Sequence, residues 1–394
     1  MEFARLLLPI LQLVAVVWVL AAVDVVPVAA QSPAGCSRRC GNVDIPYPFG
    51  LETRCAIHGG FVLRCNTTAG KLFHGDTVEV TKISVEDNKS RFNTWTSWQC
   101  YDRSTGQMKY SDAWLNLTGT VYVLSADDNK IIVLGCNNMG YMIGDTYVVG
   151  CLTKCDGTSP MVNGTCSSTS GCCEAEVPRG VRAYNGYFNP SYNTTKIWQT
   201  TPCNYVAVVE SASFEFSTTY LTSTVFYDTH KLGIPVVMEW GITRSTCEQA
   251  QNDETTPYAC VSSNSSCATN DAGYVCRCSK GYQGNPYIVD GCTDIDECNN
   301  GTSNPCTSGI CENTPGGYTC SCPRGQSMSD NGVCKEKQKL TWMALVVDGP
   351  YQTDRPQANR CTPARLPCSL GTTEPRTRRS SATPASAGTH HSGR

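Results

Sequence analysis

Acids and a cysteine stand together at positions 294–298, in the stretch DIDEC. Carboxylates this close repel one another unless a cation lies among them. Calcium takes roughly six to eight oxygen ligands in a flexible geometry. Asp294 and Glu297 can supply two carboxylates and Ile295 a backbone carbonyl, so this stretch is a candidate for half of a calcium site. The alternative is a solvated acidic linker.

Cysteine dominates the composition, with 26 residues in a chain of 394. Twelve lie from Cys36 to Cys203, six from Cys247 to Cys292, six from Cys298 to Cys334 and two in the C-terminal tail. Each block is even, so each can close its own disulfides in an oxidising compartment. The C-x(3)-C pairs at 36/40 and 151/155 are also compatible with zinc, although disulfides fit a secreted chain better.

The N-terminus reads as a secretory signal peptide over residues 1–30, with an apolar run of eighteen residues and the small-residue sequence VAA before the expected cleavage. The alternative is an uncleaved anchor, which would attach the chain to a membrane. Seven Asn-x-Ser/Thr sequons are candidate glycosylation sites: Asn66, Asn88, Asn116, Asn163, Asn193, Asn264 and Asn300. We therefore expect a secreted, extracellular or cell-wall glycoprotein.

The first cysteine block is predicted to be strand-rich. Residues 77–86, 121–136 and 206–216 alternate or cluster apolar residues as strands do, and no long helical period follows the signal segment. The expected fold class is mostly β, a disulfide-rich, multi-module extracellular protein. The formal net charge of −3 gives no basic field for nucleic acid, and we expect no nucleic-acid partner.

The second and third cysteine blocks share one spacing, with C-x-C preceded by an aromatic in GYVCRC and GYTCSC. This internal repeat resembles the epidermal-growth-factor-like (EGF-like) module. The resemblance implies that the first cysteine pairs with the third, the second with the fourth and the fifth with the sixth. The implied disulfides are Cys247–Cys267, Cys260–Cys276 and Cys278–Cys292 in the first module, and Cys298–Cys311, Cys306–Cys320 and Cys322–Cys334 in the second.

The second repeat also resembles the calcium-binding EGF pattern, because CENTPGGYTCSC places Asn313 and Tyr318 at its amide and aromatic positions. That resemblance implies Asn313 as a further side-chain ligand, with the carbonyls of Thr314 and Gly317 completing the shell. The first repeat lacks the acids, and Thr269 stands where the Asn would be. We therefore expect Ca²⁺ in the second repeat only, where it would stiffen the junction between the modules.

The stretches CSRRCGNVDIPYPFG (36–50), GCCEAEVPRG (171–180), IWQTTPCNYVAVVE (197–210) and GYQGNPYIVDGCTDIDEC (281–298) occur in this order. Together they resemble the ectodomain of plant wall-associated receptor kinases over about residues 34–335. The predicted organisation is a signal peptide (1–30), a galacturonan-binding-like core (34–101), a further cysteine-rich segment (102–246), two EGF-like modules (247–292 and 294–334) and a disordered basic tail (335–394).

The resemblance implies that the first module binds cell-wall pectin, a polymer of galacturonate. Arginine pairs with carboxylates bidentately, so Arg38, Arg39, Arg54 and Arg64 are the candidate ligand contacts. Tyr47 and Phe49 can either stack on sugar faces or pack in the core of the module. An EGF-type protein–protein adaptor or co-receptor is the alternative function, and membrane receptors of the same family are possible partners.

The resembled family continues into a transmembrane helix and a kinase. This sequence contains no Gly-rich phosphate loop, HRD or DFG motif, so we expect no kinase activity. The apolar run LTWMALVV after Cys334 is too short to span a bilayer, and no span is expected apart from the signal segment. No G-x-S-x-G or H-E-x-x-H motif occurs. Paired carboxylates for pectin cleavage remain an alternative that sequence does not exclude.

Overall fold

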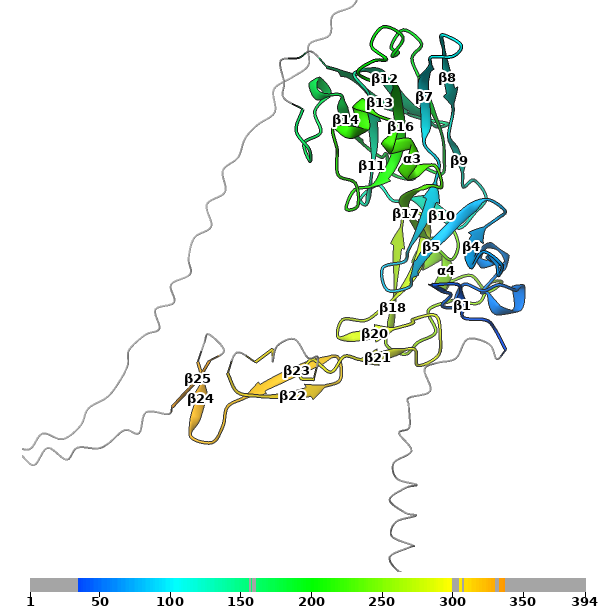
Figure 1. Ribbon diagram of the computed structural model, residues 1–394. Coiled ribbons are helices and arrows are strands. Elements are labelled where there is room, and N and C mark those ends of the chain that lie inside the picture. Colours follow the sequence, from blue (N-terminus) through cyan, green and yellow to red (C-terminus); the bar gives the residue numbers. More distant parts are fainter. Residues whose placement is uncertain are drawn as a thin grey trace, which may run out of the picture. The chain divides into compact units, whose positions relative to one another are not determined.

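The structure is a computed structural model that describes residues 35–155, 157, 161–299, 305–306, 308–329 and 333–336 (Figure 1). The predicted signal peptide, the sequon at Asn300 and nearly all of the tail, with Cys361 and Cys368, lie outside these residues. No helix within them is long and apolar enough to cross a membrane.

The N-terminal region is built from three antiparallel sheets (Figure 1). A six-stranded sheet has the order β10-β17-β6-β5-β4-β3. Its strands are β3 (Arg64–Asn66), β4 (Lys71–His74), β5 (Val78–Ser84), β6 (Lys89–Thr94), β10 (Tyr122–Leu124) and β17 (Ile234–Trp240). A small ribbon of β1 (Arg39–Cys40) and β2 (Val43–Asp44) precedes it, followed by the 3-10 turns η1 (Thr53–Cys55) and η2 (Gly59–Phe61).

A five-stranded sheet has the order β14-β11-β16-β7-β8, and a four-stranded sheet the order β13-β12-β15-β9. The strands of the first are β7 (Ser97–Asp102), β8 (Gln107–Ser111), β11 (Asn129–Leu134), β14 (Cys172–Glu176) and β16 (Cys203–Glu210). Those of the second are β9 (Trp114–Asn116), β12 (Asn137–Ile143), β13 (Val148–Lys154) and β15 (Ala183–Phe188). The helical pieces are short: η3 (Ser168–Ser170), α2 (Thr219–Thr222), α3 (Val225–His230) and α4 (Cys247–Gln251).

Strand pairing crosses the predicted boundary between residues 101 and 102. β17 pairs with β6 along six residues, from Ile234 opposite Thr94 to Glu239 opposite Lys89. β16 pairs with β7, and the disulfide Cys100–Cys203 joins the same two strands. The segments 34–101 and 102–246 therefore share two sheets, and this boundary has no counterpart in the fold. Long-range pairing of this kind leaves no local trace in the sequence.

The core explains why these strands pair as they do. β16 is buried along its whole length, and β11 nearly so, as expected for central strands covered on both faces. One buried cluster is centred on Phe49, Phe61, Tyr122 and Trp240, and a second lies around Tyr205 and Phe226. The first cluster also includes Tyr274 and Tyr287 of the first EGF-like module, so that module shares a core with the N-terminal sheets.

All 24 cysteines among the described residues are in disulfides. The EGF-like modules have the six pairings that the resemblance implied. The first block pairs as Cys36–Cys55, Cys40–Cys65, Cys100–Cys203, Cys136–Cys155, Cys151–Cys173 and Cys166–Cys172. The four cysteines of the two C-x(3)-C pairs therefore each form a disulfide with a cysteine outside their own pair. None of them is free to bind zinc, so the zinc alternative is wrong.

Each EGF-like module consists of two small hairpins. The first has β18 (Ser265–Asn270) with β19 (Gly273–Cys278) and β20 (Tyr282–Gly284) with β21 (Cys292–Asp294). The second has β22 (Ile310–Thr314) with β23 (Gly317–Ser321) and β24 (Gln326–Met328) with β25 (Cys334–Glu336). The described residues are therefore a disulfide-rich, multi-module and mostly β protein, as predicted.

Candidate functional site

The predicted calcium ligands Asp294 and Asn313 are neighbours. Asp294 ends β21 and Asn313 lies on β22, nineteen residues further on. The Asn313 side-chain amide donates to Asp294 Oδ2 at 2.8 Å, and the backbone N–H of Gly316 donates to Asp294 Oδ1 at 2.5 Å. The two halves of the sequence pattern thus meet at one carboxylate.

Glu297 contributes an unsatisfied oxygen to the same region. Its Oε2 is buried and has no hydrogen-bond partner among the described residues. Asp296, by contrast, accepts from the backbone N–H groups of Cys298 and Asn299 and caps the turn. A buried carboxylate oxygen without a partner is costly unless a cation approaches it. Glu297 therefore fits a ligand role, while the neighbouring Asp296 has a structural one.

Three predicted carbonyl ligands lie on the adjoining backbone. Ile295 donates its N–H to the Gly281 carbonyl at 2.9 Å, and its own carbonyl accepts no hydrogen bond from the other described residues. Thr314 and Gly317 face each other across the β22–β23 turn, and Thr314 Oγ1 donates to the Gly317 carbonyl at 3.0 Å. A carbonyl has two lone pairs, so Gly317 retains one for an ion.

The donor set fits calcium better than a transition metal. It consists of two carboxylates, one amide and backbone carbonyls, which are hard oxygen ligands. No group of three or more His, Cys, Asp or Glu side chains that could hold a metal occurs in the described part of the chain. Residues Asp294, Ile295, Glu297, Asn313, Thr314 and Gly317 are thus the set that would hold Ca²⁺, with only two charged members.

Close backbone packing links the candidate calcium site to the first EGF-like module. Gly281 has φ +83°, and a Cβ at this position would come within 2.2 Å of the Gly316 carbonyl oxygen. Gly316 has φ +80° and packs against the Tyr282 ring. The turn that donates to Asp294 therefore lies directly on the β20–β21 hairpin, so a bound ion would act at the junction between modules.

The four candidate arginines are all exposed, and three of them are paired with exposed acids. Arg39 bonds Asp44 at 2.8 Å and Arg54 bonds Glu52 at 2.7 Å. Arg64 lies 3.7 Å from Asp76. The Arg38 guanidinium makes no hydrogen bond or ion pair with other described residues. Exposed pairs of this kind contribute only about 0–1 kcal/mol, so a ligand carboxylate can replace the acid at little cost.

Disulfides bring the arginine positions together. Arg39, Arg54 and Arg64 each directly precede a disulfide cysteine. Cys40–Cys65 holds the Cα atoms beside Arg39 and Arg64 5.8 Å apart, and Cys36–Cys55 ties the Arg38 segment to that of Arg54 with 5.6 Å between the Cα atoms. The two disulfides therefore connect the backbone segments that carry the four arginines.

Phe49 is not available to a sugar. It is 1% exposed, and its ring lies 4.9 Å from Phe61 and 5.1 Å from Trp240 in edge-to-face contacts. Of the two roles considered for this ring, core packing is the one that the structure has, because the apolar cluster surrounds it completely. Tyr47 is half-buried, and burial raises its pKa.

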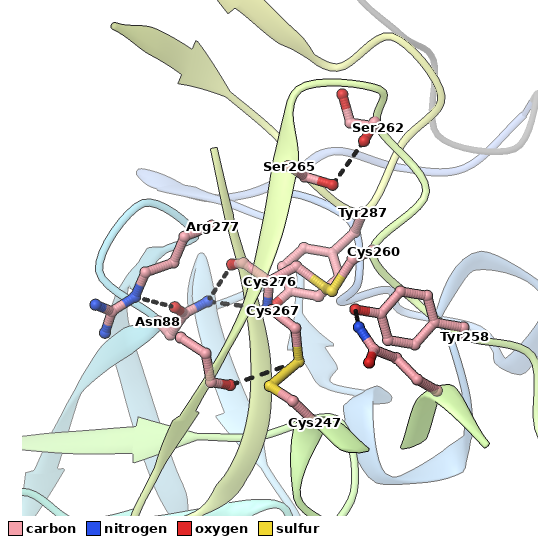
Figure 2. The surroundings of a disulfide bond; sticks show 12 residues. Asn88, Cys247, Tyr258, Cys260, Ser262, Ser265, Cys267, Cys276, Arg277 and Tyr287 are labelled. Carbon is pink, nitrogen blue, oxygen red and sulfur yellow. Dashed lines mark hydrogen bonds between the residues drawn. A yellow bond between two sulfur atoms is a disulfide. The ribbon is translucent and has the colours of Figure 1, made fainter. Parts of the chain in front are cut away.

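The prediction of a glycan on Asn88 is contradicted by the structure. Asn88 is 0% exposed, and its amide nitrogen, the atom that would carry the glycan, donates to the Tyr287 hydroxyl at 3.0 Å (Figure 2). The same nitrogen donates to the Val85 carbonyl at 3.2 Å. It also lies 3.4 Å from the carbonyl of Cys276. A glycan would remove this anchor of the first EGF-like module.

The other sequons within the described residues are accessible to different degrees. Asn66, Asn116 and Asn163 are exposed, whereas Asn193 and Asn264 are half-buried. The Asn193 amide also donates to the Pro190 carbonyl at 3.0 Å. The exposed sequons are therefore the better candidates for glycosylation.

Sequence reasoning missed the residues that dock the first EGF-like module. Asn285 donates to the Tyr47 carbonyl at 2.5 Å, and the buried Tyr287 accepts from Asn88 and from the Cys276 N–H at 2.9 Å. Both belong to the NPY triplet within GYQGNPYIVDGC. That triplet is the signal that could have identified them, since Asn-Pro favours a turn and here places an aromatic residue close to the end of the module.

The fold and the candidate site define a class of protein: a disulfide-rich, mostly β chain whose strand-rich N-terminal region is followed by an EGF-like pair with one candidate calcium site. Residues 36–94 match the family model described as wall-associated receptor kinase galacturonan-binding, and residues 294–334 match the calcium-binding EGF domain.

Curated relatives agree with both matches. Wall-associated receptor kinase 2 of Arabidopsis thaliana is 33% identical over 322 residues, which cover 79% of this chain and 41% of the relative. Wall-associated receptor kinase 5 of the same plant is 31% identical over 335 residues, covering 81% of this chain and 43% of the relative. Over about four fifths of its length, the chain is thus similar to members of the wall-associated receptor kinase family.

The chain spans about two fifths of the length of these relatives. The family matches fall on the galacturonan-binding and EGF modules, and none falls on a kinase domain.

Proposed function

We propose that this chain binds acidic galacturonan in the cell wall through the arginine surface of its N-terminal module, and that a calcium ion stiffens its second EGF-like module. The match of residues 36–94 to the galacturonan-binding family model carries the proposal. We further propose that the chain is secreted, glycosylated at Asn66, Asn116 and Asn163, and able to associate with membrane receptors of its family.

The chemistry of the surface supports an acidic ligand. Arg38 is unpaired, and Arg39, Arg54 and Arg64 are held by acids that lie in solvent. A galacturonate carboxylate can accept two N–H bonds from a guanidinium, which a lysine would not provide. The half-buried Tyr47 stays in the proposal as a stacking residue at the edge of this surface.

The calcium ion would act structurally. When bound, it supplies positive charge among Asp294, Glu297 and Asn313 and replaces the hydrogen bond between Asp294 and Asn313. Extracellular modules typically bind calcium with dissociation constants of roughly 10⁻⁴–10⁻³ M, so the site would be filled outside the cell.

The test is retention of the full chain on a polygalacturonate column. Arg38→Ala with Arg39→Ala should elute at lower salt than the wild type, because two cationic contacts are lost and salt screens those that remain. The matched control is Lys280→Ala with Arg324→Ala, which removes the same charge from exposed positions in the EGF-like modules. Equal elution of both variants would remove the arginine pair from the binding surface.

A further inference from the structure

A second candidate ligand site, lined by none of the four candidate arginines, lies beside β7, β8, β9 and α3, which are labelled in Figure 1. It is a pocket of about 460 Å³, within the range of roughly 300–1,000 Å³ that is usual for small-ligand sites. Its lining residues are Thr77, Trp95, Thr96, Trp98, Ser111, Asp112, Ala113, Trp114, Tyr227, His230 and Lys231.

Aromatic rings form its walls. Trp114 is 63% exposed and Trp95 is 40% exposed, which is unusual for side chains with so much apolar surface. Trp98 is partly buried and contacts the exposed Tyr227 ring edge-to-face, with the ring centroids 5.4 Å apart. The pocket thus contains one partly buried and three exposed aromatic rings.

The strand connection that carries Trp114 is fixed by a buried serine. Ser97 Oγ accepts from the Ala113 N–H at 2.8 Å and donates to the Gly186 carbonyl at 2.9 Å. Trp114 then begins β9, where it pairs with Asn185. Its exposure is therefore built into the fold rather than being a feature of a loose loop.

Polar groups stand between the rings. Asp112 and Lys231 make no hydrogen bond or ion pair within the described part of the chain, and Thr96 Oγ1 is buried without a partner. Burial lowers the pKa of His230 and so favours its neutral ring, which can both donate and accept a hydrogen bond. The pocket thus offers unpaired donors and acceptors and one fixed charge of each sign.

We propose that this aromatic pocket, defined by the lining residues above, binds a neutral pyranose chain. A pyranose ring has an apolar face of C–H groups that stacks on an aromatic ring and a rim of hydroxyls that needs paired donors and acceptors. Because Asp112 offsets Lys231, the pocket has no excess positive charge to attract a polyanion. None of the lining residues is one of the four candidate arginines. The pocket would therefore bind neutral sugar rings of a wall polysaccharide, and the arginines would bind its carboxylates.

The test uses one polymer in two charge states, an oligogalacturonate that is fully methyl-esterified and the same oligosaccharide after removal of the esters. Binding to the full chain is followed by isothermal titration calorimetry and by tryptophan fluorescence. Trp114→Ala should weaken binding of the esterified oligosaccharide about tenfold or more, since an exposed stacking ring is lost. The control is Tyr110→Ala, which removes a ring that is 71% exposed on neighbouring β8 but does not line the pocket.

The arginine double variant separates this proposal from the proposed function. It should weaken binding of the de-esterified form and leave the esterified form unchanged. Equal affinity of Trp114→Ala and Tyr110→Ala for the esterified probe, or no binding of that probe to the wild type, would overturn the proposal.

The chain's own glycan is the competing occupant. Asn116 lies two residues from Trp114 on β9, with both side chains exposed. Asn116→Gln should bind the esterified probe as the wild type does. Binding that appears only in Asn116→Gln would assign the pocket to that glycan and contradict the proposal.

Discussion

The two EGF-like modules have the same disulfide pattern and the same hairpin register, yet they are anchored by different means. Thr269 lies opposite Tyr274 in the first module as Asn313 lies opposite Tyr318 in the second. Tyr274 is 2% exposed, whereas Tyr318 is 43% exposed. One aromatic position is thus buried by protein and the other is left at the surface.

The ligand positions show the complementary difference. Counting back from the first cysteine of each module, Asp294 and Glu297 correspond to Thr243 and Thr246. Thr246 instead caps α4 by accepting from the Gln249 N–H at 3.3 Å. Neither threonine is charged, so the first module has no electrostatic need for an ion.

Protein contacts replace the ion in the first module. Tyr274 exchanges backbone hydrogen bonds with Ile242 and Thr243, and Arg182 reaches the carbonyls of Asp271 and Ala272 at 3.4 Å. Together with the bonds of Asn88 to Tyr287, these contacts make the first module part of the N-terminal core. A small disulfide-linked unit can therefore be held either by a neighbouring core or by a bound cation.

The largest expected effect tests the buried anchor. Tyr274→Ala should lower the free energy of unfolding by about 3–5 kcal/mol, because it empties a fully packed aromatic position. Tyr318→Ala, at the equivalent position, should cost less than about 1 kcal/mol without calcium. Urea unfolding in the presence of a chelator measures both free energies of unfolding. Equal losses in the two variants would contradict the difference between the modules.

The second-largest expected loss of stability is at Asn88. Asn88→Ala leaves the Tyr287 hydroxyl without its donor and removes the bond to Val85, so we expect a loss of about 1–3 kcal/mol. Glycopeptide mass spectrometry should find this asparagine unmodified. Occupancy by a glycan in folded protein would contradict the docked arrangement.

Calcium binding should respond to the acids of the second module alone. Asp294→Ala should weaken calcium binding tenfold or more, equivalent to about 1.4 kcal/mol, by removing the carboxylate that lies nearest Asn313. Thr243→Ala, the matched change in the first module, should leave the affinity unchanged. Isothermal titration calorimetry measures the calcium affinity of each variant. An unaltered affinity in Asp294→Ala would mean that the ion binds elsewhere.

The smallest effect concerns Glu239, which lies near Asp271 of the docked module. Burial, with a smaller contribution from Asp271, raises its pKa, so the folded chain holds this proton to a higher pH than the unfolded chain. The resulting stabilisation is full at low pH and is lost as pH rises through the raised pKa. Glu239→Gln keeps an acceptor for Ser125 and should gain less than about 1 kcal/mol at pH 7.

That gain should shrink as the pH is lowered toward 4, where the wild-type carboxyl is itself protonated. Thermal unfolding of both proteins across this pH range provides the measurement. A gain that grows at low pH would contradict the assigned direction of the pKa.

The features that could be predicted from the sequence are those set by short stretches of chain. The resemblance to the EGF-like module implied every disulfide of the two modules, and the resemblance to the calcium-binding EGF pattern implied Asn313, the residue that meets Asp294. Both depend on short stretches whose geometry is fixed by their own crosslinks.

The features that escaped prediction depend on long-range burial. The sequence left Phe49 open between sugar stacking and core packing and marked Asn88 as a glycosylation candidate, whereas both are buried in the structure. The pocket around Trp114 is likewise assembled from β9 and from α3, which lie far apart in the chain. Such positions are set by the core rather than by neighbouring residues.

Hydrogen exchange of the full chain with and without Ca²⁺ tests the central distinction most directly. Calcium should slow amide exchange in β22, β23 and residues 294–297 and leave β18 and β19 unchanged, because the core already protects them. Equal protection of both hairpins by calcium, or none in either, would contradict the account.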